Sequence, residues 1–157
     1  MPENLSKHEK NLSAIIHAST FSRYIFPFGN FIVPLVLWMA NKERFQFVDY
    51  NGKQALNFQI SMLLYSLLIG VLSLPFFFGV LPNILDIEHF DIFNFNNNFI
   101  NFNLDNFNFR KIIWPVGITG LLQAAVVIVN VVYTIIATLK TNEGQHFKYP
   151  LTINFIK

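Results

Sequence analysis

The sequence predicts an all-α fold: a polytopic membrane helical bundle with four hydrophobic helices, in a single integral membrane domain that covers residues 1–157. Three observations support this prediction. The chain is 53% hydrophobic and only 13% charged, whereas soluble domains carry about 25% charged residues. Two apolar blocks exceed the roughly 20 residues that a helix needs to cross a bilayer. Two shorter apolar blocks lie on either side of a strong turn signal.

The two long apolar blocks cover about residues 54–80 and 112–140, and we expect both to be transmembrane helices. A long extracytoplasmic loop, 81–111, separates them, and its residues 91–109 consist mostly of Asn and Phe. Much of that stretch alternates polar and aromatic residues, which is the period of an amphipathic strand. One interpretation is an aromatic hairpin on the outer headgroup layer. We favour the other interpretation, which is compositional drift in an AT-rich genome.

The two short apolar blocks, about residues 12–26 and 31–41, flank the sequence Pro27-Phe28-Gly29-Asn30, which is typical of a turn or a helix break. Each block is shorter than the roughly 17 residues of a comfortable membrane span. The pair is therefore either one broken helix that crosses the membrane once, or a short Pro/Gly-broken hairpin. The hairpin would return to its starting side after a re-entrant or a full crossing.

Positive charges distinguish these two topologies, because Lys and Arg gather on the cytoplasmic side of a membrane. A single crossing divides the charges that flank the blocks four against six, which favours neither orientation. A hairpin divides them eight against two. We therefore expect the hairpin, with both termini in the cytoplasm and with Arg110 and Lys111 outside. The eight cytoplasmic charges are then Lys7, Lys10, Lys42, Arg44, Lys53, Lys140, Lys148 and Lys157.

The residues that most often carry chemistry are absent or scattered. The chain has no cysteine, which excludes disulfides, thiolate metal sites and thiol catalysis. His8, His89 and His146 lack the spacing of metal ligands, and no nucleotide-binding loop, HExxH motif or nucleophile elbow is present. No long run of Lys and Arg suggests a nucleic-acid partner. The sequence predicts no enzyme, no catalytic residue, no metal site and no cofactor.

Polar residues recur at helical spacing within three of the apolar blocks, which places each set on one helix face. Because polar side chains are costly inside a membrane, we expect the three polar stripes to face one another within the bundle. We favour interhelical hydrogen bonding, worth about 0.6 kcal/mol per contact, over a hydrophilic path for an ion, a small solute or a peptide. The stripes are Ser13, His17, Thr20 and Tyr24; Gln54, Asn57, Ser61 and Tyr65; and Thr119, Gln123, Asn130 and Thr134.

Two basic side chains fall within the first apolar block. A histidine such as His17 could relay protons, but the apolar blocks hold no Asp or Glu to partner it, so we expect a neutral, hydrogen-bonded histidine. Arg23 lies close to the break at Pro27. There it could snorkel to a lipid headgroup or cap the carbonyl groups that the break leaves free.

Amide side chains suit the free backbone groups of a broken helix, since each offers two donors and an acceptor. We expect Gln54 and Asn57 to be buried near the cytoplasmic end of the third helix, which Gln54 opens. Asn57, one turn further in, is then expected to contact the first two helices and hold the hairpin. The full set of candidate intramembrane polar residues is His17, Arg23, Asn30, Gln54, Asn57, Gln123 and Asn130.

Three stretches carry a family resemblance: PFGNFIVPLVLWMANKE (27–43), VDYNGKQALNFQIS (48–61) and NEGQHFKYPLTINFI (142–156). The runs QALNFQ and YPLT carry most of it. The chain resembles a family of small bacterial membrane proteins of unknown function, related to the four-helix Tic component of the chloroplast inner-envelope protein-import machinery. The resemblance covers nearly the whole chain apart from the Asn/Phe loop.

The resemblance implies a multi-pass protein of the bacterial cytoplasmic (inner) membrane and supplies no catalytic residue. Together with the polar stripes, it predicts a non-enzymatic membrane subunit or scaffold of a larger envelope complex, linked to protein transport. The alternative is a small oligomeric channel or transporter that uses the stripes. The expected partners are the lipid bilayer and other membrane subunits, not nucleic acid, and the sequence indicates no particular small-molecule substrate.

Overall fold

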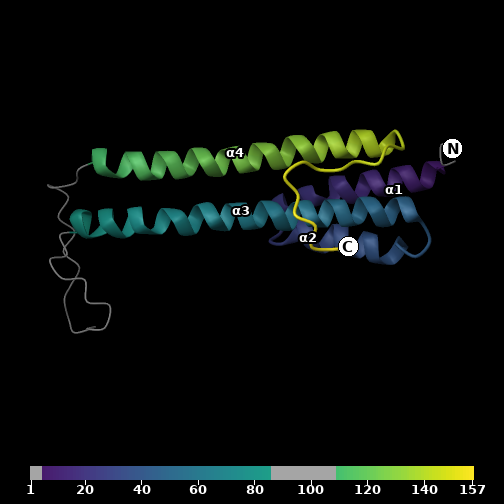
Figure 1. Cartoon of the computed structure of the whole chain (residues 1–157), viewed down its shortest axis with the longest axis horizontal. Coiled ribbons are helices and arrows are strands. Elements are labelled where there is room, and N and C mark those ends of the chain that lie inside the picture. Colours follow the sequence, from purple (N-terminus) through teal and green to yellow (C-terminus); the bar gives the residue numbers. More distant parts are fainter. Residues whose placement is uncertain (1–4, 86–108) are drawn as a thin grey trace, which may run out of the picture. The chain divides into compact units, whose positions relative to one another are not determined.

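The computed structural model describes the backbone of residues 5–85 and 109–157, and the side chains of residues 5–75 and 113–157. These residues form helices and irregular segments and contain no strand, so the all-α prediction is confirmed for them (Figure 1). Residues 86–108, which hold most of the expected loop 81–111, lie outside the described residues. The elements are α1 (Lys7–Ala18), the 3-10 helix η1 (Ser19–Tyr24), α2 (Gly29–Asn41), α3 (Gln46–Leu85) and α4 (Phe109–Asn142).

The described chain divides into two compact units. Unit 1 contains Met1–Tyr65 and Val126–Lys157, and therefore α1, η1, α2, the first half of α3, the second half of α4 and the C-terminal tail. Unit 2 contains Ser66–Ala125. Among the side chains that the structure describes, every buried polar residue except Ser73 lies in unit 1. Unit 1 therefore holds the candidate functional residues that are sealed inside the protein.

Helix α1 begins at a capping box. The Ser6 hydroxyl accepts from the backbone of Glu9, and the Glu9 carboxylate accepts from the backbone of Ser6, which satisfies two otherwise unpaired donors. Near the other end, the hydroxyl groups of Ser19, Thr20 and Ser22 each donate to the carbonyl group three residues earlier. Such bonds compete with the α-helical ladder. The expected helix 12–26 therefore starts earlier, at Lys7, and tightens into η1.

The turn between η1 and α2 is built on Phe28 and Gly29. Phe28 adopts a left-handed conformation with φ 62°, which is uncommon for a residue other than glycine. A side chain on Gly29 would collide with the backbone of Ser22, because its Cβ would lie 2.5 Å from the Ser22 carbonyl oxygen. This close approach folds η1 back against α2, and α1–η1–α2 forms the short hairpin expected from the sequence.

Helices α3 and α4 are the two elements long and apolar enough to cross a membrane. By length and composition, the candidate spans are Gln46–Pro75 and Ile113–Asn142. Many of their large apolar side chains are exposed. The other described helices do not meet this criterion, so four membrane-spanning helices are not shown.

Helix α3 begins at Gln46, eight residues before the predicted start at Gln54. Its first turns are anchored by the ion pair between Lys53 and Asp49 over 2.6 Å and by a hydrogen bond from the Trp38 indole to Asp49 over 2.8 Å. The ring of Trp38 covers Gly52, where an added Cβ would come within 2.3 Å of it. Asp49 and Lys53 are therefore accommodated in the first turns of α3, because they pair with each other and Asp49 also binds Trp38 of α2. Helix α4 exceeds its predicted range 112–140 by only a few residues.

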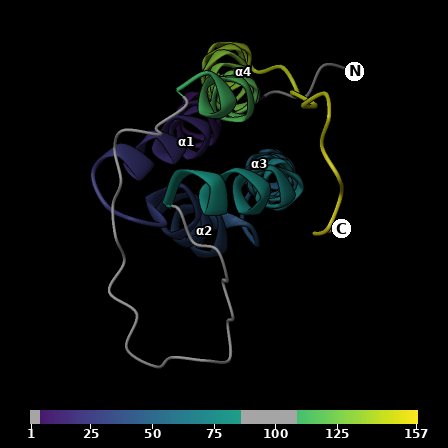
Figure 2. The ribbon, with the colours of Figure 1, turned by 90° about the vertical axis from the view of Figure 1, so that its left-hand side faces the viewer.

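The core of unit 1 consists of two apolar clusters. One joins α1, α2 and α3, and the other joins α3, α4 and the tail. Figure 2 shows the tail passing on the outer side of α3, away from α1. The first cluster contains Ile16, Trp38, Val48, Ala55 and Leu56, and the second contains Phe58, Met62, Ala137, Phe147 and Tyr149.

Candidate functional site

Many of the buried polar side chains of unit 1 belong to three hydrogen-bonded groups. The histidine cluster contains His17, Asn51, Thr141 and Tyr149. The amide cluster contains Asn30, Gln59 and Asn130. The tail contact joins Asn57, Ser61 and Tyr65 of α3 to residues 151–156.

The histidine cluster connects α1, α3, α4 and the tail. His17 is completely buried, with Nε2 lying 3.2 Å from the Asn51 side-chain oxygen and Nδ1 lying 2.9 Å from the Tyr149 hydroxyl. The Asn51 amide nitrogen donates to the carbonyl group of Phe47 over 2.9 Å, which fixes its oxygen toward His17. His17 therefore donates from Nε2 and accepts from Tyr149 at Nδ1. A neutral imidazole satisfies both contacts.

Burial disfavours charge on both ring-bearing members of this cluster, which lie outside the two candidate spans. Burial lowers the pKa of His17 to about 4, and the hydrogen bond with Asn51 opposes this effect only in part. Burial likewise raises the pKa of Tyr149. Both groups are neutral near pH 7, so the cluster is a set of uncharged hydrogen bonds.

The amide cluster connects α2, α3 and α4 through one oxygen atom. The side-chain oxygen of Gln59 accepts from the amide groups of Asn30 over 3.0 Å and Asn130 over 3.1 Å. Asn130 and Gln59 are buried and Asn30 is half-buried. The Gln59 amide nitrogen is buried and has no partner among the described residues. Three helices thus meet at a single carbonyl group.

The tail contact is made by three polar residues spaced four apart on one face of α3. Asn57 accepts from the backbone N–H groups of Phe155 and Ile156, over 3.1 and 2.8 Å, and donates to the Ile156 carbonyl group over 3.0 Å. The Ser61 hydroxyl accepts from the Ile153 backbone over 2.9 Å. The Tyr65 hydroxyl donates to the Leu151 carbonyl group over 2.9 Å. The tail therefore runs antiparallel to α3, bound through its main chain.

This contact corrects the role expected for Asn57. Asn57 is buried, but it bonds the tail and not the first two helices. The residue that contacts the hairpin is Gln59, which binds Asn30. Asn57 and Gln59 are two positions apart, so they point to different sides of α3, and the hairpin lies on the side of Gln59.

The remaining candidate residues are separated from these clusters. Gln54 is buried two turns inside α3, and its side-chain oxygen has no partner among the described residues. Gln123 belongs to unit 2, where it exchanges two hydrogen bonds with Ser66. Arg23 is exposed and caps no carbonyl group of the described chain; its guanidinium lies 5.8 Å from the centre of the Tyr24 ring.

A comparison with known families identifies the chain. A family model matches residues 8–156, which is nearly its whole length. The chain belongs to the magnetosome magnetite crystal formation protein family. No curated protein and no solved structure matches it.

Membership of the magnetosome family agrees with part of the resemblance found in the sequence. The magnetosome family and the two candidate spans indicate a bacterial membrane protein. The match shows no link to the Tic component, and its description concerns magnetite crystal formation, not protein transport.

The donor atoms of the described residues indicate which kind of ligand the candidate site of this magnetosome family member could bind. Among residues 5–75 and 113–157, no three His, Asp or Glu side chains gather as a metal-binding set. The buried polar groups are amides, hydroxyls and one neutral imidazole that already serves two hydrogen bonds. This chemistry suits the joining of helices and the tail.

Sequence reasoning missed four residues of these clusters: Asn51, Gln59, Thr141 and Tyr149. Gln59 lies two positions after Asn57 and therefore on another face of α3 than the polar stripe, and Asn51 precedes the predicted start of the helix at Gln54. The signal of Gln59 is an amide side chain among apolar residues in the stretch QALNFQ, whereas Asn51 stands in the polar stretch DYNGK and gives no such signal. Tyr149 stands in the irregular tail, where no periodicity could reveal its burial.

Proposed function

We propose that the chain is a non-enzymatic integral membrane subunit that supports magnetite crystal formation by packing into a larger assembly of the magnetosome membrane. One observation carries this proposal: the histidine and amide clusters of unit 1 bond buried polar side chains to one another, while many large apolar side chains of the unit are exposed on its outside. Such a body offers neighbouring membrane proteins a rigid apolar surface. The family description supplies the link to magnetite.

The same observation argues against the alternative of a channel or transporter. A path for ions or solutes needs polar groups that are free to exchange partners with the passing species. His17, Asn51 and Asn130 instead hold fixed partners inside the protein. Interhelical hydrogen bonding is thus the better interpretation of the buried stripes. Protein transport, implied by the resemblance alone, gains no support from the site.

The proposal includes a topology in which only α3 and α4 cross the bilayer. Helix α2 has 13 residues, and at 1.5 Å per residue it is about 20 Å long, shorter than a hydrocarbon core of about 30 Å. The α1–α2 hairpin then enters the membrane and returns. Both termini lie in the cytoplasm of a protein of the bacterial inner membrane or of a membrane derived from it.

Purification from native membranes tests the proposal. The chain, tagged at its N-terminus, is extracted in a mild detergent, and the proteins that accompany it are identified. We expect unlike chains in stable proportion, and magnetite crystals of altered size or number in cells that lack the protein. A matched preparation of the variant Gln59→Ala, which breaks the amide cluster, should recover fewer of these partners than Gln145→Ala, which changes an exposed amide. Recovery of the chain alone would favour the channel.

A further inference from the structure

The tail after Tyr149 has two edges of different character. The edge that faces α3 carries the main-chain groups bound by Asn57, Ser61 and Tyr65. Away from it point the large side chains of Leu151, Ile153 and Phe155, which are 63%, 44% and 47% exposed. Large apolar side chains that are exposed close together on a protein surface mark a contact with lipid or with another protein.

We propose that residues 149–156 are a lipid-embedded strap. The strap enters the interfacial layer of the bilayer beside α3, presents Leu151, Ile153 and Phe155 to lipid chains, and leaves the membrane again at Lys157. The inference rests on the proposed function in one respect, because it requires α3 to span the bilayer.

The hydrogen bonds of the strap meet the main demand of a membrane environment. Irregular backbone at membrane depth must find its partners within the protein, since lipid chains offer none. Three polar residues of α3, at regular spacing, supply partners at three successive levels of the strap. The turn that makes the return possible is at Pro150-Leu151, where Leu151 holds a left-handed conformation with φ 60°.

Charged residues mark the two ends of the strap. Lys148 precedes it and Lys157 follows it, and both are exposed. Lysine at such positions reaches the headgroup layer while its aliphatic stem stays in apolar surroundings. The strap is therefore bounded by residues that favour headgroups.

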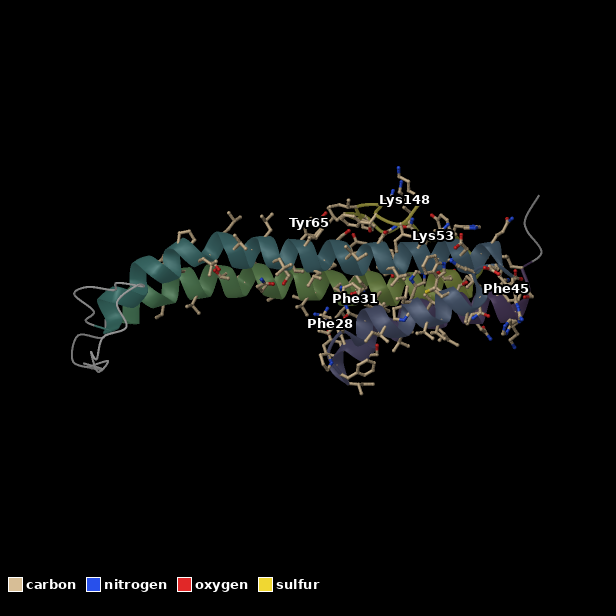
Figure 3. The ribbon with its side chains drawn as sticks, turned by 90° about the horizontal axis from the view of Figure 1, so that it is seen from below. Phe28, Phe31, Phe45, Lys53, Tyr65 and Lys148 are labelled. Carbon is tan, nitrogen blue, oxygen red and sulfur yellow. The ribbon has the colours of Figure 1, made fainter. Side chains whose placement is uncertain are left out.

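Two neighbouring surfaces show the same preference for lipid. Leu64 lies seven residues after Asn57, on the strap side of α3 by helical period, and is 40% exposed. On the other side of α3, the turn of the α1–α2 hairpin exposes Phe28. Figure 3 shows Phe28 and Tyr65 toward the same end of unit 1, with Phe45 at the other end. The hairpin and the strap thus extend in the same direction along α3.

The absence of cysteine makes a direct test possible. Single cysteines replace Leu151, Phe155 or Lys148, each is labelled with a fluorophore, and each protein is reconstituted into phosphatidylcholine–phosphatidylglycerol vesicles. Lipids that carry a spin-label quencher on the acyl chain then report contact. We expect loss of fluorescence at positions 151 and 155 and little loss at 148. Leu67→Cys, an exposed position of α3 in unit 2, is the internal reference for a span.

The reference separates two kinds of failure. If position 67 is quenched and positions 151 and 155 are not, the strap lies outside lipid and the inference is wrong, while the proposed function stands. If position 67 also escapes quenching, both proposals fail. If the labelled protein is not quenched at position 151, and the unlabelled Leu151→Cys variant forms disulfide-linked dimers under a mild oxidant, the surface belongs to a second copy of the chain and the inference is overturned.

A second pair of variants tests how the strap is held. In the protein labelled at position 151, Asn57→Ala should release the strap and abolish the quenching. Gln54→Ala, which removes a buried amide that makes no bond to the tail, should leave the quenching unchanged. Equal quenching in both variants would overturn the holding role of Asn57. If Asn57→Ala does not fold, the comparison of quenching at positions 148, 151 and 155 still tests whether the strap lies in lipid.

Discussion

The hydroxyl group of Tyr149 donates a hydrogen bond to Nδ1 of His17 over 2.9 Å, across 132 residues of sequence. The contact joins the tail to α1, the two segments of unit 1 that are furthest apart in the chain. The side-chain oxygen of Asn51 can only accept, so Nε2 of His17 carries the proton and Nδ1 is left to accept from Tyr149. A structural histidine is thereby held by partners on both sides.

Removal of this hydroxyl group should destabilise unit 1. In Tyr149→Phe the ring can keep its stacking on Phe58, whose centroid lies 4.1 Å away, while His17 loses its donor. A buried acceptor left without a partner costs about 1–3 kcal/mol, so thermal unfolding in detergent should occur at a lower temperature. Tyr24→Phe, which alters an exposed ring, is the control. Equal midpoints for the two variants would contradict the assigned bond.

The burial of neutral His17 predicts a specific pH dependence. Its pKa is about 4 in the folded protein, against 6.5 for an ordinary histidine. Between these values the unfolded chain binds a proton that the folded chain does not, so stability should fall as pH decreases from 6.5 toward 4, by up to about 1.4 kcal/mol per pH unit. Above pH 6.5 this group should have no effect.

Melting curves of the detergent-solubilised protein across this pH range measure the effect. His17→Gln should flatten the dependence between the two pKa values, and His8→Gln, at the N-terminal end of α1, should preserve it. The same slope in His17→Gln as in the parent would show that another group is responsible.

The packing of Trp38 on Gly52 predicts that the glycine cannot be enlarged. In Gly52→Ala the new methyl group would lie 2.3 Å from the Trp38 ring, so α2 would have to move away from α3. Overpacking of this kind costs about 1–3 kcal/mol. Gly70→Ala, in the same helix but with open space around it, should be as stable as the parent or slightly more stable. The difference between the two melting temperatures checks the prediction.

Gln59 should be more sensitive than any other single amide of the hairpin contact. Gln59→Ala leaves the amide groups of Asn30 and Asn130 without their common acceptor, and we expect a loss of about 1–3 kcal/mol. Limited proteolysis in the η1–α2 turn should become faster, because the hairpin loses its bond to α3. Gln145→Ala is the matched control, and equal cleavage rates for the two variants would refute the assignment.

The proposed topology predicts opposite locations for two reporter fusions. A reporter at Lys157 should be cytoplasmic, and one inserted within residues 96–98, which lie outside the described residues, should be on the other side of the membrane. The expectation follows from the distribution of Lys and Arg, eight against two. Activity of both reporters on the same side would remove the two-span topology.

Sequence patterns predict the helices of this chain well where apolar residues form long continuous blocks. The break at Pro27 to Asn30 marks the hairpin turn, because Gly29 and a left-handed Phe28 are both required there. Helix starts are predicted less well. Hydropathy places the start of α3 at Gln54, since the preceding turns contain Asp49 and Lys53. These charges are compatible with the helix only because they pair with each other and with Trp38.

The candidate site shows the same limit more clearly. Periodicity correctly selects Asn57, Ser61 and Tyr65 as one face of α3, but it cannot state what lies opposite. Their partner is the main chain of the tail, and a main chain leaves no pattern in the sequence that would predict its position. Gln59 was missed for a related reason: a single amide that binds two others from different helices belongs to no stripe.

The tail contact also constrains the order in which unit 1 can fold. The bonds of Asn57 to Ile156 join residues 99 positions apart, and those of Ser61 to Ile153 join residues 92 apart. Contacts of such sequence separation form late, since a long loop must close first. Until the tail arrives, the side chains of Asn57 and Tyr65 on α3 lack the partners that the tail supplies. A chain shortened before Tyr149 should therefore be able to insert its helices and still lack the contacts that complete unit 1.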